Sequence, residues 1–192
     1  MPIDYLPVSW EEYHTLSQKL AAKLLSDGKK VDEIIAISRG GLTAGHLLTD
    51  LLRVPISTFT IQSYSDLTVQ GQVKITKPLS SPIHDKNILL VDDVSDTGKT
   101  LVRALEYLKA QQPKKITTLT LFYKPHSVYK PDYFAKTTPA WIIFPYEVTE
   151  TIITLYQNMK KEKKSDEQMK HFLETLHFTK EQIAFAKKFY CK

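Results

Sequence analysis

The chain is poor in cysteine and has no long apolar runs. Its single cysteine, Cys191, excludes a disulfide or a cysteine-based zinc site within the chain, which agrees with a reducing cytoplasm. No apolar run approaches the length that a membrane-spanning helix needs. Residues 1–4 show no basic region followed by an apolar core, so we expect no signal peptide. These absences predict a cytoplasmic protein that does not enter a membrane.

Positive charge is unevenly distributed along the 192 residues. The net charge is +5, and residues 158–192 hold nine lysines against five acidic residues, which gives +4 for this tail. A basic surface for nucleic acid would therefore lie mainly in the tail. The tail has no arginine, which nucleic-acid surfaces commonly use, so a solvated lysine-rich helix face is the favoured interpretation. We do not expect nucleic acid as a partner.

Short apolar runs alternate with amphipathic segments through the first 150 residues. Hydrophobic residues make up 42% of the chain and charged residues 24%, which is typical of a globular protein. The repeated order of strand, loop, helix and strand predicts an α/β fold with a central, mainly parallel sheet flanked by helices. The expected strands are 34–37, 55–62, 88–91, 116–123 and 141–144, and the expected helices are 10–25, 42–52 and 97–110.

Two segments depart from this pattern. Residues 63–81 are polar and could contain a short hairpin with arms at 69–70 and 73–75. After residue 147 only helical patterns follow, at 150–161, 165–176 and 179–189, and the last two begin with capping boxes. We therefore predict a first domain at 1–150 and a helical carboxyl-terminal extension at 151–192.

The most informative segment is 88–100, where four apolar residues lead into two acids, a third acid and a turn. A nucleoside triphosphate P-loop is excluded, because it needs a glycine five residues before Gly98, where this chain has Asp93. Carboxylates suit ribose hydroxyls and Mg²⁺, and the N–H groups that begin the following helix suit a phosphate. The alternative is that the acids only cap the helix. Asp92, Asp93 and Asp96 repel one another, however, and need a compensating ligand.

A second anion site is predicted directly after strand 34–37, at Ser38-Arg39-Gly40-Gly41. The two glycines let backbone N–H groups approach an anion closely, and Arg39 supplies a bidentate phosphate donor. The helix that follows adds the positive end of its dipole. Taken alone, this motif could also be a plain strand-to-helix turn.

Segments 88–100 and 38–41 together resemble the phosphoribosyl pyrophosphate (PRPP) site of the type I phosphoribosyltransferases, and the resemblance covers roughly residues 5–150. It implies that fold with a flexible hood loop, Mg²⁺ as cofactor, a homodimer or homotetramer, and a cis Ser38–Arg39 peptide bond. It implies that Asp92 and Asp93 hold the ribose and the metal. The residues that it assigns to the 5′-phosphate are Ser95, Asp96, Thr97, Gly98, Lys99 and Thr100, and those assigned to pyrophosphate are Ser38, Arg39 and Gly40.

The predicted base site is most similar to that of the bacterial xanthine-guanine enzymes of this family. Lys124 follows a strand, and a lysine has only donors, which favours a 6-oxo over a 6-amino purine. Trp141 would stack on the base. Ile142 and Glu147 complete the predicted site, although an aspartate is usual where Glu147 stands. The alternative is a surface Lys124 and a core Trp141.

Asp96 is the candidate acid or base at purine N7, and Ser63 and Tyr64 are candidate contacts of a lid that excludes water. The predicted reaction transfers the 5-phosphoribosyl group of PRPP to a 6-oxopurine (xanthine, guanine or hypoxanthine). Its products are a nucleoside 5′-monophosphate and pyrophosphate, and its role is purine salvage. Two alternatives stay open. One is a regulator of the same fold that senses PRPP or nucleotides and binds nucleic acid, and the other is an enzyme for adenine or a pyrimidine.

Overall fold

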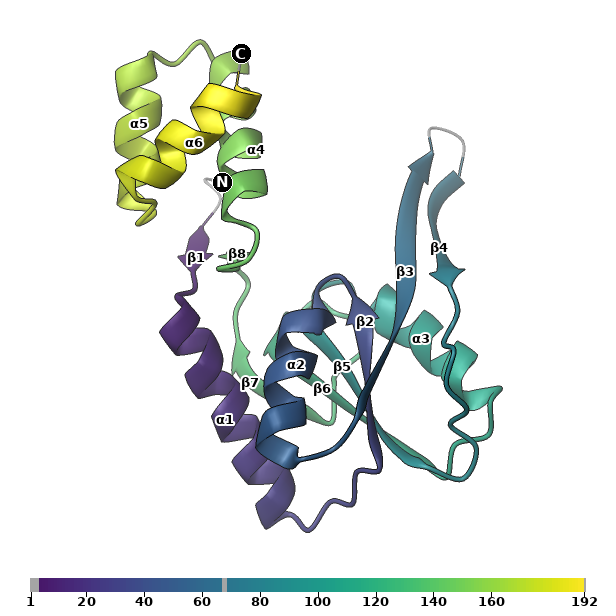
Figure 1. Ribbon diagram of the computed structural model, residues 1–192. Coiled ribbons are helices and arrows are strands. Elements are labelled where there is room, and N and C mark those ends of the chain that lie inside the picture. The colour runs from purple at the N-terminus through teal and green to yellow at the C-terminus, as the bar shows by residue number, and fades with distance from the viewer. Residues whose placement is uncertain (1–3, 67–68, 192) are drawn as a thin grey trace. The chain divides into compact units, whose positions relative to one another are not determined.

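The structure of the chain is a computed structural model that describes residues 4–66 and 69–191. The chain divides into two compact units, each of which is described by itself. The smaller unit is Met1–Tyr13 with Ala140–Lys192, and the larger unit is His14–Pro139. Helix α1 (Trp10–Ser26) begins in the smaller unit and continues into the larger one (Figure 1). The division at residue 150 into two domains stays a prediction.

The larger unit is built on a six-stranded sheet in the order β4-β3-β2-β5-β6-β7. All neighbouring strands are parallel except β3 and β4, so the mainly parallel sheet is confirmed. Its strands are β2 (Glu33–Ser38), β3 (Ile56–Asp66), β4 (Val69–Lys77), β5 (Asn87–Ser95), β6 (Lys115–Tyr123) and β7 (Tyr133–Thr137). The central strands β2 and β5 are apolar over consecutive residues because helices cover both faces of the sheet.

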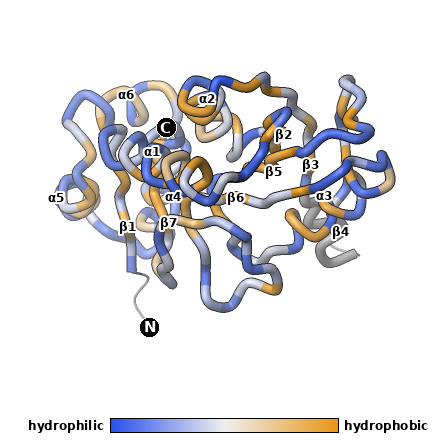
Figure 2. Tube along the Cα trace, turned by 90° about the horizontal axis from the view of Figure 1, so that it is seen from below, coloured by the Kyte–Doolittle hydropathy of each residue, from blue (hydrophilic) through white to orange (hydrophobic). Residues whose placement is uncertain are grey.

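Alternate residues of the central strands pack against different helices. On one face, Ile35 and Leu90 join a core with residues of α3 (Lys99–Lys109). On the other face, a Cβ atom at Gly45 of α2 (Gly41–Leu52) would lie 2.9 Å from the Ala36 Cβ, so glycine permits close packing of this helix on the sheet. Figure 2 shows hydrophobic residues along β5, the strand that carries the acidic motif into the site.

Two features of the sheet differ from the prediction. The strand at the β6 edge is β7, which was not predicted because Tyr133–Thr137 has no apolar run and only its first residue is buried. The strand expected to end at residue 62 continues to Asp66 and pairs antiparallel with β4 over residues 60–77. Such a hairpin needs little apolar sequence, because cross-strand bonds satisfy its backbone groups. The short arms expected at 69–70 and 73–75 belong to one strand, β4.

The smaller unit combines a two-stranded parallel sheet with three helices. Its strand β1 (Tyr5–Pro7) pairs with β8 (Trp141–Ile143), so the apolar run at 141–144 does not join the central sheet. The helices α4 (Val148–Lys161), α5 (Asp166–Thr175) and α6 (Lys180–Tyr190) confirm the helical prediction for the tail. Both predicted capping boxes, at Ser165 and Thr179, are present. Among the described residues no helix has the length and apolar character required to cross a membrane.

Candidate active site

Asp92 and Asp93 lie where the buried part of β5 ends. The Asp92 residue is 8% exposed, and its carboxylate accepts hydrogen bonds from the backbone N–H groups of Asp93 and Gly41. Burial raises the pKa of Asp92 well above its usual range, and the neighbouring Asp93 carboxylate raises it further. Such a pair of carboxylates, with one of them desolvated, is suited to a cation or to hydroxyl donors, which restore the charged form.

The loop after β2 approaches this acidic pair closely. The Ser38–Arg39 peptide bond is cis, as the family resemblance implies. A Cβ atom at Gly40 would lie 2.3 Å from the Asp93 Oδ2, and one at Gly41 would lie 2.3 Å from the Val91 backbone oxygen. Glycine at both positions therefore permits the close approach of the loop after β2 to the end of β5. The structure thus brings the Ser38–Gly40 segment together with Asp92 and Asp93, and Arg39 is exposed there.

The turn at 95–98 and the start of α3 form the next part of the site. Gly98 has a positive φ of 79°, which favours glycine, and it immediately precedes the helix. Asp96, Thr97 and Lys99 lie along this turn and at the start of the helix, and Thr100 is half-buried in the first turn of α3. The first N–H groups of α3 have no partners within the helix and suit an anion, and the Lys99 N–H donates to the Thr97 Oγ1 at 3.4 Å.

Ser95, in contrast, is buried and holds a second loop in place. Its hydroxyl lies 2.9 Å from the Ser127 Oγ and donates to the Tyr129 backbone oxygen at 2.7 Å. The Val128 N–H donates to the Thr97 backbone oxygen at 3.0 Å. Hydrogen bonds therefore hold the loop between β6 and β7 against the turn that leads into α3. The side chain of Ser95 takes part in these hydrogen bonds, whereas the sequence predicted only a phosphate-binding role for this residue.

Lys124 and Asp96 come together beside this turn. The parallel register pairs Ser95 with Tyr123, which brings the next residues of the two strands side by side. The Lys124 Nζ lies 3.9 Å from the Asp96 Oδ1, and the Lys124 side chain is 9% exposed, against 53% for Asp96. A buried ammonium group at the carboxyl end of β6 fits a role in recognising a polar ligand better than a role on the surface.

Sequence reasoning missed one residue of this cluster, His126. Its Nε2 atom lies 3.1 Å from the Asp96 Oδ1, closer than Lys124. The available signal was its position two residues after Lys124 and directly after Pro125, at the end of a strand. This position does not identify His126 as a site residue, because its contact with Asp96 depends on the conformation of the β6–β7 loop.

The remaining residues predicted for the base site belong to the smaller unit. Trp141 begins β8 and is 56% exposed, so it is not a core residue, whereas Ile142 is buried. Glu147 precedes α4, and its Oε1 accepts from the Phe144 N–H at 3.4 Å. Trp141 and Glu147 both line a pocket of about 190 Å³, together with Tyr5, Glu150, Thr151, Thr154, Leu155 and Asn158.

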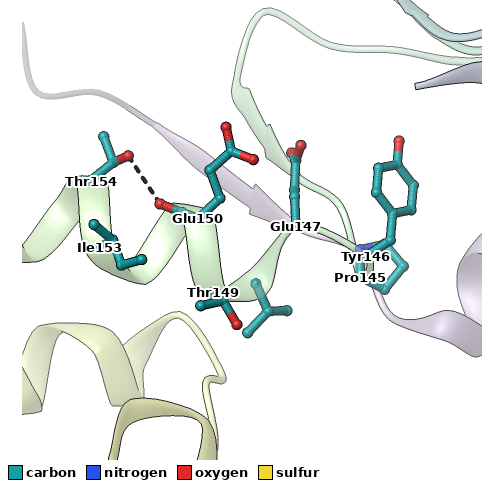
Figure 3. Close-up of a pocket in the computed structure, with 8 residues that line it drawn as sticks. Pro145, Tyr146, Glu147, Thr149, Glu150, Ile153 and Thr154 are labelled. Carbon is teal, nitrogen blue, oxygen red and sulfur yellow. Dashed lines mark hydrogen bonds between the residues drawn. The ribbon is translucent and has the colours of Figure 1, made fainter. Parts of the chain in front are cut away.

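A neighbouring pocket of about 500 Å³ at the start of α4 also includes Glu147 and Glu150 (Figure 3). The two carboxyl groups point towards the same side of the chain in that view, and the Thr154 hydroxyl donates to the Glu150 backbone oxygen at 3.0 Å. The smaller unit therefore carries an exposed indole ring and acidic side chains at one place. Lys124 belongs to the larger unit, so a common base pocket of Lys124 and Trp141 stays a prediction.

The predicted lid residues lie in the β3–β4 hairpin. The backbone of Ser63 pairs with Val73 and that of Tyr64 with Gln72, whereas their side chains lie outside what the structure describes. Within residues 4–66 and 69–191, no group of three or more His, Cys, Asp and Glu side chains is arranged to hold a metal ion. A metal at Asp92 and Asp93 would therefore need further ligands from a substrate or from water.

Comparison with known proteins identifies relatives of this arrangement. The family model of the phosphoribosyl transferase domain matches residues 9–153. A purine phosphoribosyltransferase from Pyrococcus horikoshii Ot3 is 34% identical with a TM-score of 0.69, covering 75% of this chain and 94% of that chain. A xanthine-guanine-hypoxanthine phosphoribosyltransferase from Helicobacter pylori is 28% identical with a TM-score of 0.68, covering 78% and 98%. A hypoxanthine-guanine phosphoribosyltransferase from Bacillus anthracis is 25% identical with a TM-score of 0.61, covering 72% and 85%.

Proposed function

This chain belongs to the phosphoribosyl transferase domain family, and we propose that it transfers the 5-phosphoribosyl group of PRPP to a 6-oxopurine in purine salvage. One observation carries the proposal. The buried carboxyl of Asp92 and the neighbouring Asp93 lie against the Ser38–Gly41 loop at the carboxyl ends of β2 and β5, and β5 continues there into the turn that begins α3. Such strand ends are where ligands bind in open α/β sheets, and the groups there match the ribose, pyrophosphate and 5′-phosphate of PRPP.

Each part of PRPP has a corresponding group. Asp92 and Asp93 would accept hydrogen bonds from the ribose hydroxyls. The N–H groups of residues 96–100, with the Thr97 and Thr100 hydroxyls, would bind the 5′-phosphate at the amino end of α3. Arg39 and the backbone at Ser38 and Gly40 would hold pyrophosphate, whose negative charge increases as it leaves.

The residues present fit Mg²⁺, because this ion is commonly bound by one or two carboxylates with waters and substrate oxygens. Asp92 and Asp93 would hold it. When bound, the ion would supply positive charge that neutralises the pyrophosphate oxygens. The raised pKa of Asp92 agrees with such a role, since a cation favours the charged form that burial disfavours.

In the proposed reaction the bond between C1′ of the ribose and the pyrophosphate oxygen breaks, and a bond between C1′ and the purine N9 forms. Pyrophosphate leaves with the electron pair of the broken bond, and the N7 proton of the base passes to the Asp96 carboxylate. The reacting carbon becomes positively charged on the way, so positioning and charge stabilisation supply most of the rate. The β3–β4 hairpin with Ser63 and Tyr64 would close over the site, because water would otherwise capture that carbon.

Base selection follows from donor chemistry. The ammonium group of Lys124 would donate to the purine O6, and the exposed indole ring of Trp141 would stack on the base beside Ile142 and Glu147. An adenine 6-amino group offers Lys124 no acceptor, so adenine would gain no hydrogen bond from the lysine. The named activities of the relatives in Helicobacter pylori and Bacillus anthracis support a 6-oxopurine as substrate.

The test measures pyrophosphate release from PRPP and Mg²⁺, with xanthine, guanine, hypoxanthine, adenine, uracil and orotate offered one at a time. We expect turnover with one or more 6-oxopurines only. The substitution Lys124→Ala should lower kcat/KM for the base by about 100-fold and leave the Kd of PRPP within about twofold, since the lysine contacts only the base. Turnover restricted to adenine or a pyrimidine would contradict the base site. PRPP binding without any turnover would favour a regulator of the same fold.

A further inference from the structure

The pair of His126 and Asp96 points to a positioning residue for the reaction proposed above. The His126 Nε2 lies 3.1 Å from the Asp96 Oδ1, which is hydrogen-bond distance. The Lys124 Nζ lies 3.9 Å from the same Oδ1 atom, beyond hydrogen-bond distance. Because the Asp96 side chain is 53% exposed, packing alone does not restrict its rotamer. His126 therefore supplies the bond that orients it.

The backbone on both sides of this bond is held firmly. The Lys124 N–H donates to the Ser95 backbone oxygen at 3.1 Å, and the Val128 N–H donates to the Thr97 backbone oxygen at 3.0 Å. Along the chain, His126 lies between the two donor residues, and Asp96 lies between the two acceptor residues. These two hydrogen bonds fix the backbone of His126 relative to the backbone of Asp96, which brings the two exposed side chains within reach of each other.

Gly98 strengthens the same junction. A Cβ atom there would lie 2.5 Å from the Ser127 Oγ and 2.6 Å from the Tyr129 N, so the two loops are in direct contact. The Ser127 N–H also donates to the Lys124 backbone oxygen at 3.0 Å, which closes the tight turn that carries His126. This turn presents the imidazole to Asp96, while the neighbouring Lys124 side chain is buried in the same cluster.

We propose that His126 donates through Nε2 to the Asp96 Oδ1 and so holds Asp96 with Oδ2 available to the purine N7. A carboxylate only accepts hydrogen bonds, so the Nε2 atom must carry the proton in this contact. The proposal rests on the proposed function, because it gives His126 its role through the base-facing Asp96. His126 is a positioning residue in this scheme and does not touch the substrate.

The test compares steady-state kinetics of His126→Phe, which removes the donor and keeps a ring, with His126→Gln, which keeps a donor. We expect His126→Phe to lower kcat about tenfold, with the KM for PRPP within about twofold, and His126→Gln to retain most of the activity. His126 is 58% exposed, so both variants should fold, and His126→Ala provides a second way to remove the donor. In an Asp96→Asn background, His126→Phe should lower kcat no further.

The matched control is His84→Phe. His84 pairs with Asp85 at 3.2 Å and is 63% exposed, so this substitution removes a similar pair elsewhere in the larger unit and should leave kcat unchanged. An unchanged kcat in both His126→Phe and His126→Ala would overturn the proposal, and so would a full additional loss in the Asp96→Asn background. If the wild-type protein turns over no 6-oxopurine, the proposed function fails and this inference fails with it. An active wild type with fully active His126 variants overturns this inference alone.

Discussion

Asp92 in the larger unit and Asp166 in the smaller unit both have altered pKa values, but in opposite directions. Burial and the Asp93 carboxylate raise the pKa of Asp92. Hydrogen bonds from Lys187 and Tyr156 lower the pKa of Asp166, at the start of α5. The charged form of Asp166 therefore stabilises the helices of the smaller unit, whereas the charged form of Asp92 opposes folding of the larger unit. A buried carboxylate whose charged form opposes folding is typical of a functional site, whereas the hydrogen bonds of Asp166 give that residue a structural role.

The largest effect expected from this comparison is that of Asp92→Asn. We expect kcat/KM for PRPP to fall by about 100-fold or more, because an amide cannot match the charge of the carboxylate towards Mg²⁺ and ribose. The Tm should stay the same or rise at pH 7. The pKa of Asp92 is higher in the folded protein than in the unfolded chain. As the pH rises from the unfolded-state pKa through the folded-state pKa, the unfolded chain loses its proton first, so the stability of the wild type falls. The amide of the variant does not titrate, so the variant lacks this dependence.

Calorimetry of both proteins from pH 4 to pH 8 checks this sign. The difference in Tm between Asp92→Asn and wild type should increase with pH in favour of the variant. A variant that loses stability at pH 7 while keeping its activity would reverse the assignment and make Asp92 a structural residue.

A smaller effect is expected at the junction between the turn before α3 and the β6–β7 loop. The substitution Gly98→Ala should lower the free energy of unfolding by about 2 kcal/mol, because it combines a positive φ with overpacking against Ser127 and Tyr129. Urea denaturation measures the change. Activity should also fall, since both Asp96 and His126 depend on this junction.

The matched control for that change is Gly28→Ala. Gly28 has a similar positive φ of 60°, but a Cβ atom there would meet nothing within 4 Å. The substitution Gly28→Ala should lower the free energy of unfolding by only about 1 kcal/mol and leave activity unchanged. Equal losses at Gly28 and Gly98 would mean that backbone conformation alone, and not the contact between the loops, makes glycine necessary at residue 98.

The same contrast explains which parts of the molecule could be predicted from the sequence. The acids at 92–96, the Ser38–Gly41 loop and the capping boxes at Ser165 and Thr179 depend on neighbours within a few residues, so their patterns are visible in the chain. Strand β7 and the contact of His126 with Asp96 depend on segments 14 to 30 residues apart. Neither has an apolar period or a spacing that identifies it.

Separation in sequence also limits the predicted base site. Lys124 was correctly expected at the end of a strand, and the structure adds that it is buried and near Asp96. The run at 141–144 reads as one more strand of a parallel sheet, because it is short and apolar. Its actual partner is β1, which has only three residues and whose middle residue is Leu6. A strand of three residues is too short to show an alternation of apolar and polar residues, so the sequence does not reveal that β1 pairs with β8.

The smallest effect is expected for Asp166→Asn in the smaller unit. Lys187 donates to the Asp166 Oδ2 at 2.9 Å and Tyr156 donates to its Oδ1 at 3.1 Å, but the carboxylate is largely exposed, so solvent screens the pair. At pH 7 the variant should show a slightly lower Tm and unchanged kcat. Because the folded-state pKa of Asp166 is lowered, its contribution is present above the ordinary value of 3.8 and is lost as the pH falls through the lowered pKa. The Tm difference between Asp166→Asn and wild type should therefore disappear in acid. At Asp92 it is the variant that gains in relative stability, and it does so as the pH rises. A Tm difference at Asp166 that persists below the lowered pKa would mean that Asp166 stabilises the smaller unit without its charge.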